Sequence, residues 1–177
     1  MFKNTKERYG SMAKSLHWTM SVLILCMLFV GYFMGNWGIA AIYNLHKLTG
    51  LLILILVIVR IMWTLNNTQP ALPPAMKRPE HVLSRIVQGL LYICMVFMPL
   101  SGWAMVTAFG YFPHLGSVVI PMPGIPIDQN LALFLAEVHG TIAIVLIVLI
   151  SLHVLGALKH HFINKDEVLK KMWPGAK

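Results

Sequence analysis

Charged residues and cysteines are scarce in this chain of 177 residues. Only 11% of the residues are charged and 58% are hydrophobic, which excludes an ordinary soluble domain and favours a protein with several membrane spans. The two cysteines, Cys26 and Cys94, stand singly in apolar runs, without a CxxC pair or a CxxCH signature for covalent cofactor attachment. We therefore expect both to be small buried hydrophobic residues.

Apolar segments dominate the chain instead, and several of them are long enough to cross about 30 Å of hydrocarbon. They are Leu16 to Met34, Leu45 to Trp63, Ile86 to Phe109 and Val138 to Leu158. The sequence therefore predicts an all-α fold, a four-helix transmembrane bundle in a lipid bilayer that forms one domain over residues 1–177. We expect the spans at about 14–35, 40–64, 83–108 and 131–160.

Basic residues gather on one side of these predicted spans. All lysines and arginines except Lys47 lie in the N-terminal arm, around the loop between the second and third spans, or in the C-terminal tail with Lys177. By the positive-inside rule, both termini face the cytoplasm. The net charge of +8 thus reports topology, and no nucleic-acid partner is expected, because the cations flank apolar helices rather than a soluble face.

Two of the predicted loops contain several prolines. The loop from Asn66 to Pro79 contains Pro70, Pro73 and Pro74, which predicts a short extended connection that is not helical through its middle. The outer loop, 110–130, is rich in proline and apolar residues, and we expect it to pack over the outer end of the bundle.

The third predicted span contains no histidine and is predicted to be a packing wall. Pro99 should kink it, while Gly89, Ser101 and Gly102 should let neighbouring helices approach closely.

The most informative pattern is a pair of histidines in the fourth predicted span. His139 and His153 are fourteen residues apart, which brings a helix back to within about 40° of the same face and separates the two imidazoles by about 21 Å. One helix would thus present two stacked metal ligands inside a membrane. This pattern predicts two haems, one near each side of the bilayer, and therefore transmembrane electron transfer.

Each of these histidines has a candidate partner at its own depth. His17 lies near the cytoplasmic end of the first span and should pair with His153, whereas His46 lies near the outer end of the second and should pair with His139. Each pair fills both axial positions of one haem iron. Ligation by two imidazoles leaves no open position, which favours electron transfer over oxygen binding.

Other residues fit around these pairs. Arg60 lies fourteen residues after His46, on the same face of the helix and one leaflet inward. It is a natural partner for a propionate of the inner haem. The alternative is that it only extends its charged group to the membrane surface, as arginines at helix ends often do. Gly50, Gly140 and Gly156 would leave room beside the backbone for a flat macrocycle.

His160 is seven residues after His153 and lies two turns further inward on almost the same face. It is placed to hydrogen-bond a quinone carbonyl or a propionate, and the alternative is an interface residue without a ligand.

Three other interpretations of the histidines compete with haem. Zinc usually takes four ligands, and two histidines without cysteine or carboxylate fall short of that number. A proton relay needs no pairing and would not predict the fourteen-residue spacing. A structural bundle whose histidines only hydrogen-bond would be colourless.

Longer motifs around these histidines resemble the bacterial cytochrome b561 family over almost the whole chain. They are ERYGSMAKSLHW at His17, LHKLTG at His46, EVHG at His139 and SLHVLGALKHHFINKDEVLKKM from His153 onward. The resemblance implies a bacterial inner-membrane protein in which His17, His46, His139 and His153 ligate two b-type haems.

The resemblance also implies an enzyme, an oxidoreductase of the superoxide oxidase type. Superoxide would give its electron to the outer haem, and ubiquinone would be reduced at the inner side, with the family's quinone-side histidine falling on His160. Superoxide is an anion, and Lys47 beside His46 is the one cation predicted on the outer side, so it could attract the substrate.

The alternative function is that of a dihaem membrane-anchor subunit. Such a subunit would pass electrons between a partner redox subunit, a dehydrogenase or hydrogenase, and the quinone pool. A stand-alone enzyme needs an entrance over the outer haem, whereas an anchor needs a docking surface, and we expect the loop 110–130 to decide between them.

Overall fold

Four long helices form the molecule. The structure, a computed structural model, describes residues 1–71, 73 and 76–175, so Pro74 and Lys177 of the predicted linker and tail lie outside the described residues. The helices are α1 (Ser11–Trp37), α2 (Ala40–Leu65), α3 (Arg78–Ala108) and α4 (Gln129–Lys159). All 4 are long and apolar enough to span a membrane, which confirms the predicted four-helix bundle.

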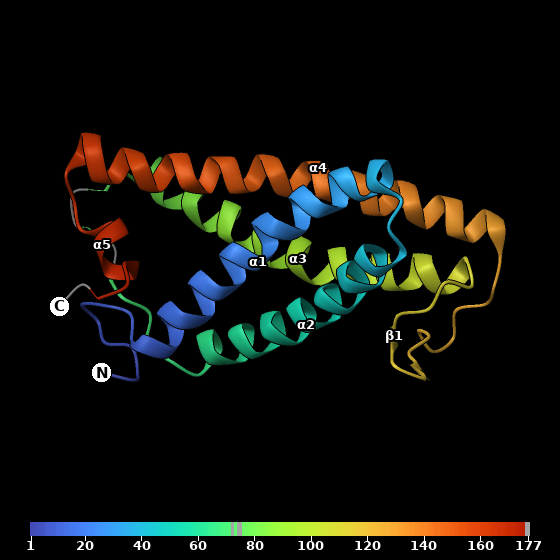
Figure 1. Ribbon diagram of the computed structural model, residues 1–177. Coiled ribbons are helices and arrows are strands. Elements are labelled where there is room, and N and C mark those ends of the chain that lie inside the picture. The colour runs from blue at the N-terminus through green and yellow to red at the C-terminus, as the bar shows by residue number, and fades with distance from the viewer. Residues whose placement is uncertain (72, 74–75, 176–177) are drawn as a thin grey trace.

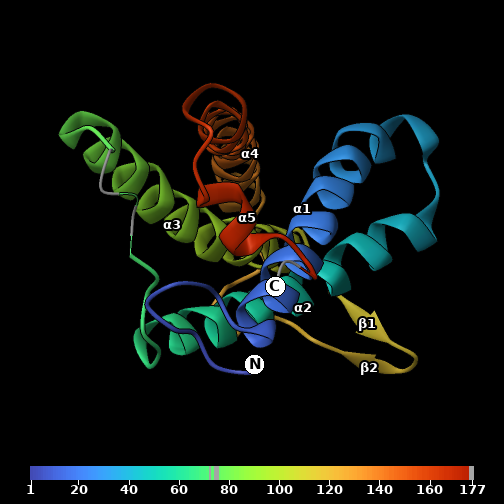
Figure 2. The same ribbon diagram turned by 90° about the vertical axis from the view of Figure 1, so that its left-hand side faces the viewer.

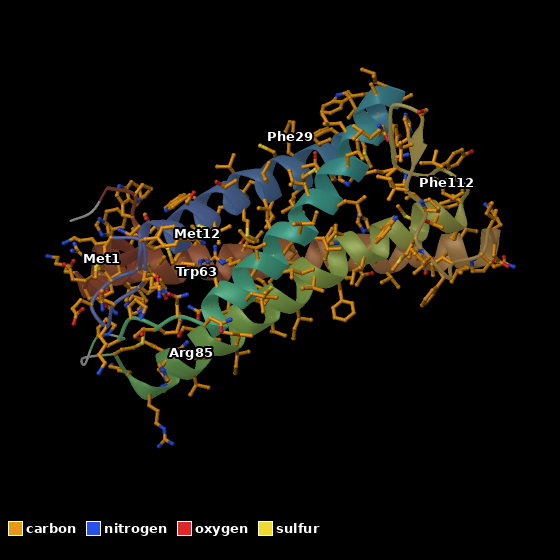
Figure 3. The ribbon with its side chains drawn as sticks, turned by 90° about the horizontal axis from the view of Figure 1, so that it is seen from below. Met1, Met12, Phe29, Trp63, Arg85 and Phe112 are labelled. Carbon is orange, nitrogen blue, oxygen red and sulfur yellow. The ribbon has the colours of Figure 1, made fainter. Side chains whose placement is uncertain are left out.

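The helices alternate in direction along the bundle. In Figure 1, α1 and α3 run from left to right, α2 and α4 return, and both termini lie at the left. We call this left-hand end the inner end, and the opposite end, which carries a short hairpin, the outer end. Figure 3 shows the labelled Met1 and Trp63 near the inner end and Phe112 at the outer end.

Local sequence signals explain where the helices begin and end. Gly38 ends α1 in a left-handed conformation with φ 62°, which suits a residue without a Cβ. Pro79 lies in the first turn of α3, where its missing N–H is not needed, and the helix therefore begins earlier than the predicted span. Asp128 caps α4 by accepting a hydrogen bond from the Leu131 N–H at 2.8 Å.

Packing between the helices is uneven. The most extensive packing is that of α3 along α4, followed by α1 against α2 and α2 against α3. Figure 2, which looks along the bundle, shows α4 between α3 on the left and α1 on the right, with α2 below them. Two small clusters make the core, one of Met20, Ile53 and Val57 and one of Val87, Cys94, Leu146 and Leu149.

Most large apolar side chains point outward, as expected of a surface that faces lipid rather than water. Cys94 is buried as predicted. The prediction for Cys26 was wrong, because this residue lies exposed on the outside of α1.

The inner end is closed by the C-terminal segment. After α4 the chain makes a π-helical turn, η1 (His160–Asn164), and a short helix, α5 (Val168–Met172), that folds back toward α1. The indole N–H of Trp18 donates to the Met172 carbonyl at 2.9 Å, and the Trp18 and Trp173 rings meet edge to face at 5.6 Å. These contacts place the end of α5 beside Trp18, the residue after His17.

The outer end carries the predicted packing loop. Its strands, β1 (His114–Leu115) and β2 (Val118–Val119), form an antiparallel hairpin. Asn44 of α2 exchanges two hydrogen bonds with the His114 backbone, at 2.8 and 3.0 Å, and the Trp103 indole of α3 donates to the Ile120 carbonyl at 2.9 Å. The loop is therefore tied to the outer ends of both α2 and α3.

The hydrogen bonds of Trp18 and Trp103 can be compared by proteolysis, because only the first one holds the C-terminal segment. Trp18→Phe should loosen the C-terminal segment by about 1 kcal/mol, or roughly fivefold more opening, and so speed tryptic cleavage after Lys170 and Lys171. Trp103→Phe, the matched control, should leave that cleavage unchanged, because its partner is in the outer loop. Equal cleavage rates in both variants and wild type would show that the Trp18 bond does not hold the segment.

Candidate metal centres between the helices

The structure brings the four histidines of the spans together in two pairs. The rings of His17 on α1 and His153 on α4 have centroids 6.2 Å apart at the inner end. The rings of His46 on α2 and His139 on α4 have centroids 6.5 Å apart toward the outer end. These are the pairs expected from depth, and α4 contributes one histidine to each.

The ring spacing fits two axial ligands of one metal ion. A metal–imidazole nitrogen bond is about 2 Å long and the nitrogen lies about 1 Å from the ring centre, so two opposed imidazoles on one metal have centres about 6 Å apart. Both pairs match that value. The rings are inclined at 71° and 77°, so they do not stack on each other.

His139 is oriented by the third helix. Its Nδ1 lies 3.0 Å from the Met98 carbonyl and 3.1 Å from the Ser101 hydroxyl, which itself donates to the Met98 carbonyl at 2.9 Å. Because a carbonyl only accepts, the hydrogen of the imidazole is on Nδ1, and Nε2 keeps its lone pair for a metal. The same arrangement holds metal-binding histidines in place elsewhere.

His46 has an unused nitrogen. Its Nδ1 is buried and has no hydrogen-bond partner among the described residues. A buried polar atom without a partner costs about 1–3 kcal/mol, so nearly all such atoms in folded proteins have one. The orphaned nitrogen marks the His46 ring as a site that a further group would complete.

Glycines make space for the outer pair. A Cβ on Gly102 of α3 would lie 2.7 Å from Cε1 of His139, and a Cβ on Gly31 of α1 would lie 3.1 Å from Cε1 of His46. Gly102 was expected to allow close helix approach, and it does so against a histidine ring. Gly31 was missed, although its position fourteen residues after His17 places it on the same face of α1.

The other predicted glycines differ. At Gly140 and Gly156 a Cβ would meet no described atom within 4 Å, in keeping with the room predicted beside the ligands. Gly50 would meet only Met27 Cε, at 3.9 Å. A Cβ on Gly89 likewise meets no described atom within 4 Å, so no close helix approach depends on this glycine.

Arg60 lies beside the inner pair. It is close enough to interact electrostatically with both His17 and His153. Its Nε donates to the hydroxyl of Tyr92 on α3 at 3.1 Å, and Thr64 lies 3.3 Å from the same hydroxyl. The position of Arg60 fits an anionic group bound at the inner pair, and Tyr92 is an orienting residue that the sequence did not reveal.

Tyr9 of the N-terminal arm belongs to the same neighbourhood. Burial raises the pKa of its phenol, and the positive charges of Arg85 and Arg60 oppose this shift. The phenol is therefore neutral at pH 7.

The remaining predicted residues lie at the two ends. His160 is buried in η1, with 7% of the residue exposed. Lys47 is half-buried, and its ammonium donates to the carbonyls of Tyr111 and Phe112 at 3.1 and 3.2 Å. Lys47 therefore connects α2 to the outer loop directly beside His46.

The donor set is unlike that of a zinc site. Among the described residues, no group of three or more histidine, cysteine, aspartate or glutamate side chains comes together. Four-coordinate zinc needs a larger set than each histidine pair offers. Two opposed imidazoles suit a metal whose other positions are filled by a flat macrocycle, as in haem.

Four apolar helices with two half-buried histidine pairs define a membrane bundle of the dihistidine cytochrome type. Residues 8–175 match the family described as prokaryotic cytochrome b561. The chain belongs to this family of membrane electron-transfer proteins, which bind haem b, and it is a multi-pass protein of the bacterial inner membrane.

Curated relatives agree with this assignment. The chain is 28% identical to cytochrome b561 homolog 2 of Escherichia coli (strain K12), over 97% of this chain and 94% of the relative. It is 24% identical to cytochrome b561 homolog 1 of the same organism, over 97% and 99% of the two chains. It is 27% identical to the probable superoxide oxidase CybB of Yersinia pestis, over 73% of each chain.

The glycine contact predicts a selective loss of haem. Gly102→Ala should push the His139 ring from its position, because the new Cβ would lie 2.7 Å from Cε1, and should lower bound haem by about half if each pair holds one haem. Haem per chain is measured by its absorption after extraction. Gly89→Ala on the same helix is the matched control and should keep full haem. Equal haem in both variants would contradict the tight contact.

Proposed function

We propose that this protein is a dihaem superoxide:ubiquinone oxidoreductase. The observation that carries the proposal is the geometry of the two histidine pairs. Their ring centroids are 6.2 and 6.5 Å apart, and α4 contributes one histidine to each pair at a different depth. His17 and His153 would hold the inner haem b, and His46 and His139 the outer one. When bound, haem supplies a one-electron carrier at each pair.

The overall reaction balances two one-electron oxidations against one two-electron reduction. Two superoxide ions and one ubiquinone, with two protons, give two molecules of oxygen and one ubiquinol. Two histidines would hold each haem, and a haem held by two imidazoles would supply outer-sphere electron transfer. The protein's task is to bind its substrates at opposite ends and to hold the carriers between them.

The outer end has a cation that suits superoxide. Lys47 follows His46 in the sequence. Its ammonium donates hydrogen bonds to two backbone carbonyls of the outer loop. Its positive charge is therefore not neutralised by these contacts, and a fixed positive charge raises the encounter rate of an anionic substrate.

The inner end has groups that suit quinone reduction. Both termini lie at this end. The lysines and arginines of the sequence, Lys47 excepted, flank the same ends of the spans, which by the positive-inside rule is the cytoplasmic side. Arg60, oriented by Tyr92, would pair with a propionate of the inner haem. His160 is buried at the start of η1, seven residues after His153, and would hydrogen-bond a quinone carbonyl.

The relatives support this function in different degrees. The relative named a probable superoxide oxidase is similar over only part of its length, whereas the two relatives matched almost end to end have names that state no substrate. The similarity therefore supports membrane electron transfer more strongly than the choice of superoxide as donor.

A membrane-anchor subunit is the second candidate, and one observation favours it. Leu115, Val118 and Val119 of the outer hairpin are 69%, 62% and 58% exposed. Exposed apolar side chains at a bundle end suit the docking of a partner redox subunit as well as contact with lipid headgroups. In that case electrons would pass between the partner and the quinone pool.

The proposal predicts both haem content and electron flow. Purified in detergent, the wild type should bind two haems, and His139→Ala and His153→Ala should each leave one, because each removes a ligand from one pair. Haem absorption should shift to the reduced form while superoxide is generated and return when a soluble quinone is added.

Three results would contradict parts of this proposal. Equal loss of both haems in each folded single variant would refute the pairing. Two haems that do not respond to superoxide would favour the anchor subunit. A colourless protein would refute haem binding.

Lys47 makes a separate prediction about the rate of haem reduction. Lys47→Gln should slow reduction by superoxide about two- to tenfold at low ionic strength, and the difference should shrink at high salt. Lys47→Arg keeps the charge and is the matched control. Identical rates for the glutamine variant and wild type at low salt would exclude a steering role.

A further inference from the structure

The turn after α4 buries a histidine at the inner end of the bundle. α4 ends at Lys159 and the chain continues as the π-helical turn η1, in which His160 is 7% exposed. Single π-helical turns are rare and occur often at functional sites. The neighbouring side chains of η1 that follow His161 are exposed, so the turn selects His160 for the interior.

His160 is paired with a carboxylate. Its Nδ1 lies 2.6 Å from Oδ2 of Asp166, and the two side chains are 10% and 20% exposed. An ionised carboxylate only accepts, so Nδ1 carries the hydrogen and donates it. Asn164 Nδ2 lies at a longer 3.3 Å from the same nitrogen and is itself a donor, so the Asp166 contact decides the tautomer.

The carboxylate is held in place by three further features. Lys165 adopts a left-handed conformation with φ 53°, which turns the chain back toward η1. The Asp166 N–H donates to the His160 carbonyl at 3.1 Å, and Asp166 Oδ1 accepts from the Val168 N–H at 3.0 Å. One oxygen therefore caps α5 while the other orients the imidazole.

We propose that His160 and Asp166 form a proton-donating pair for the quinone, with Asp166 as the positioning residue. This inference rests on the proposed function, in which quinone is reduced at the inner end. Asp166 accepts from Nδ1, so Nε2 is the ring nitrogen left to face a ligand. In the imidazolium form, Nε2 carries a hydrogen that the ring can donate to a quinone oxygen.

The proton transfer balances as follows at the quinone. Two electrons, one from each superoxide, reduce the quinone, and each of its oxygens takes up a proton. One O–H bond forms as the Nε2–H bond of His160 breaks, and the neutral imidazole then regains a proton from water at the inner end. The second quinone oxygen takes its proton from solvent water at the inner end. Asp166 is partly exposed, so the pair meets that solvent.

Two other charged groups lie near His160. Glu80 of α3 interacts electrostatically with His160, and Lys159 of α4 forms an ion pair with Glu80 at 2.5 Å. Lys159 offsets much of the Glu80 charge. Asp166 is therefore the carboxylate that contacts the ring directly.

The test uses two neutralising substitutions next to each other. Asp166→Asn keeps an Oδ1 that can cap α5 but removes the negative charge beside His160. Glu167→Gln removes the same charge one residue away, where the side chain is 61% exposed and pairs with Lys170. Both are made in the full-length holoprotein, and haem content and spectrum are recorded first.

The measured quantity is the rate at which a soluble ubiquinone reoxidises the reduced haem, followed from pH 5 to 9. Asp166→Asn should slow this reaction about tenfold or more, because the imidazole loses the carboxylate that accepts its Nδ1 hydrogen and leaves Nε2 to face the quinone. Glu167→Gln should follow the wild-type profile. Reoxidation by ferricyanide, which takes an electron without a proton, should be the same in all three proteins.

His160→Ala separates failure of this inference from failure of the proposed quinone site. If His160→Ala slows reoxidation by quinone while Asp166→Asn follows the wild type at every pH, the positioning role of Asp166 is wrong and the quinone site stands. If Asp166→Asn is slow with ferricyanide too, Asp166 only supports the fold. If His160→Ala has no effect, the quinone site itself is wrong and the pair has no substrate to serve.

Discussion

Opposed imidazoles across helices that otherwise pack loosely are the constraint on which this bundle depends. A histidine within a hydrocarbon layer is costly unless it has a partner, and the four histidines of the spans meet two by two. α4 supplies one ring to each pair, while its main packing partner is α3 and not α1 or α2. The histidine rings thus add contacts from α4 to α1 and α2, beside the apolar packing of Ile24 and Leu28 of α1 on the cluster that contains Leu146 and Leu149.

The third helix supports this constraint without contributing a ligand. Met98 and Ser101 direct the Nδ1 hydrogen of His139, Gly102 admits the ring, and Tyr92 orients Arg60 beside the inner pair. The predicted packing wall is therefore also the surface that positions polar groups of both pairs. Such contacts fix the orientation of metal-binding histidines and raise their basicity.

The two ends of the bundle are built differently around the same central arrangement. At the outer end, a loop is tied to α2 and α3 and holds the ammonium of Lys47 through backbone carbonyls. At the inner end, the chain's own C-terminal segment returns to Trp18 and carries the carboxylate that contacts His160. A cation held by backbone carbonyls suits an anion, whereas a buried imidazole with its own carboxylate suits proton transfer.

Helical periodicity and charge were enough to predict the four spans, the pairing by depth and the common end of the termini. Those properties are local, because residues fourteen apart share a face of any straight helix and hydrophobic length decides a span. The partners of the histidines were not predictable in this way. Ser101 is 38 residues from His139, and Tyr92 is 32 residues from Arg60. Their contacts depend on how each helix is rotated and tilted against its neighbour, and Asp166 reaches His160 only because η1 and Lys165 turn the chain back. Rotation, tilt and chain reversal arise from the packing of the whole bundle, which no periodicity within one helix contains.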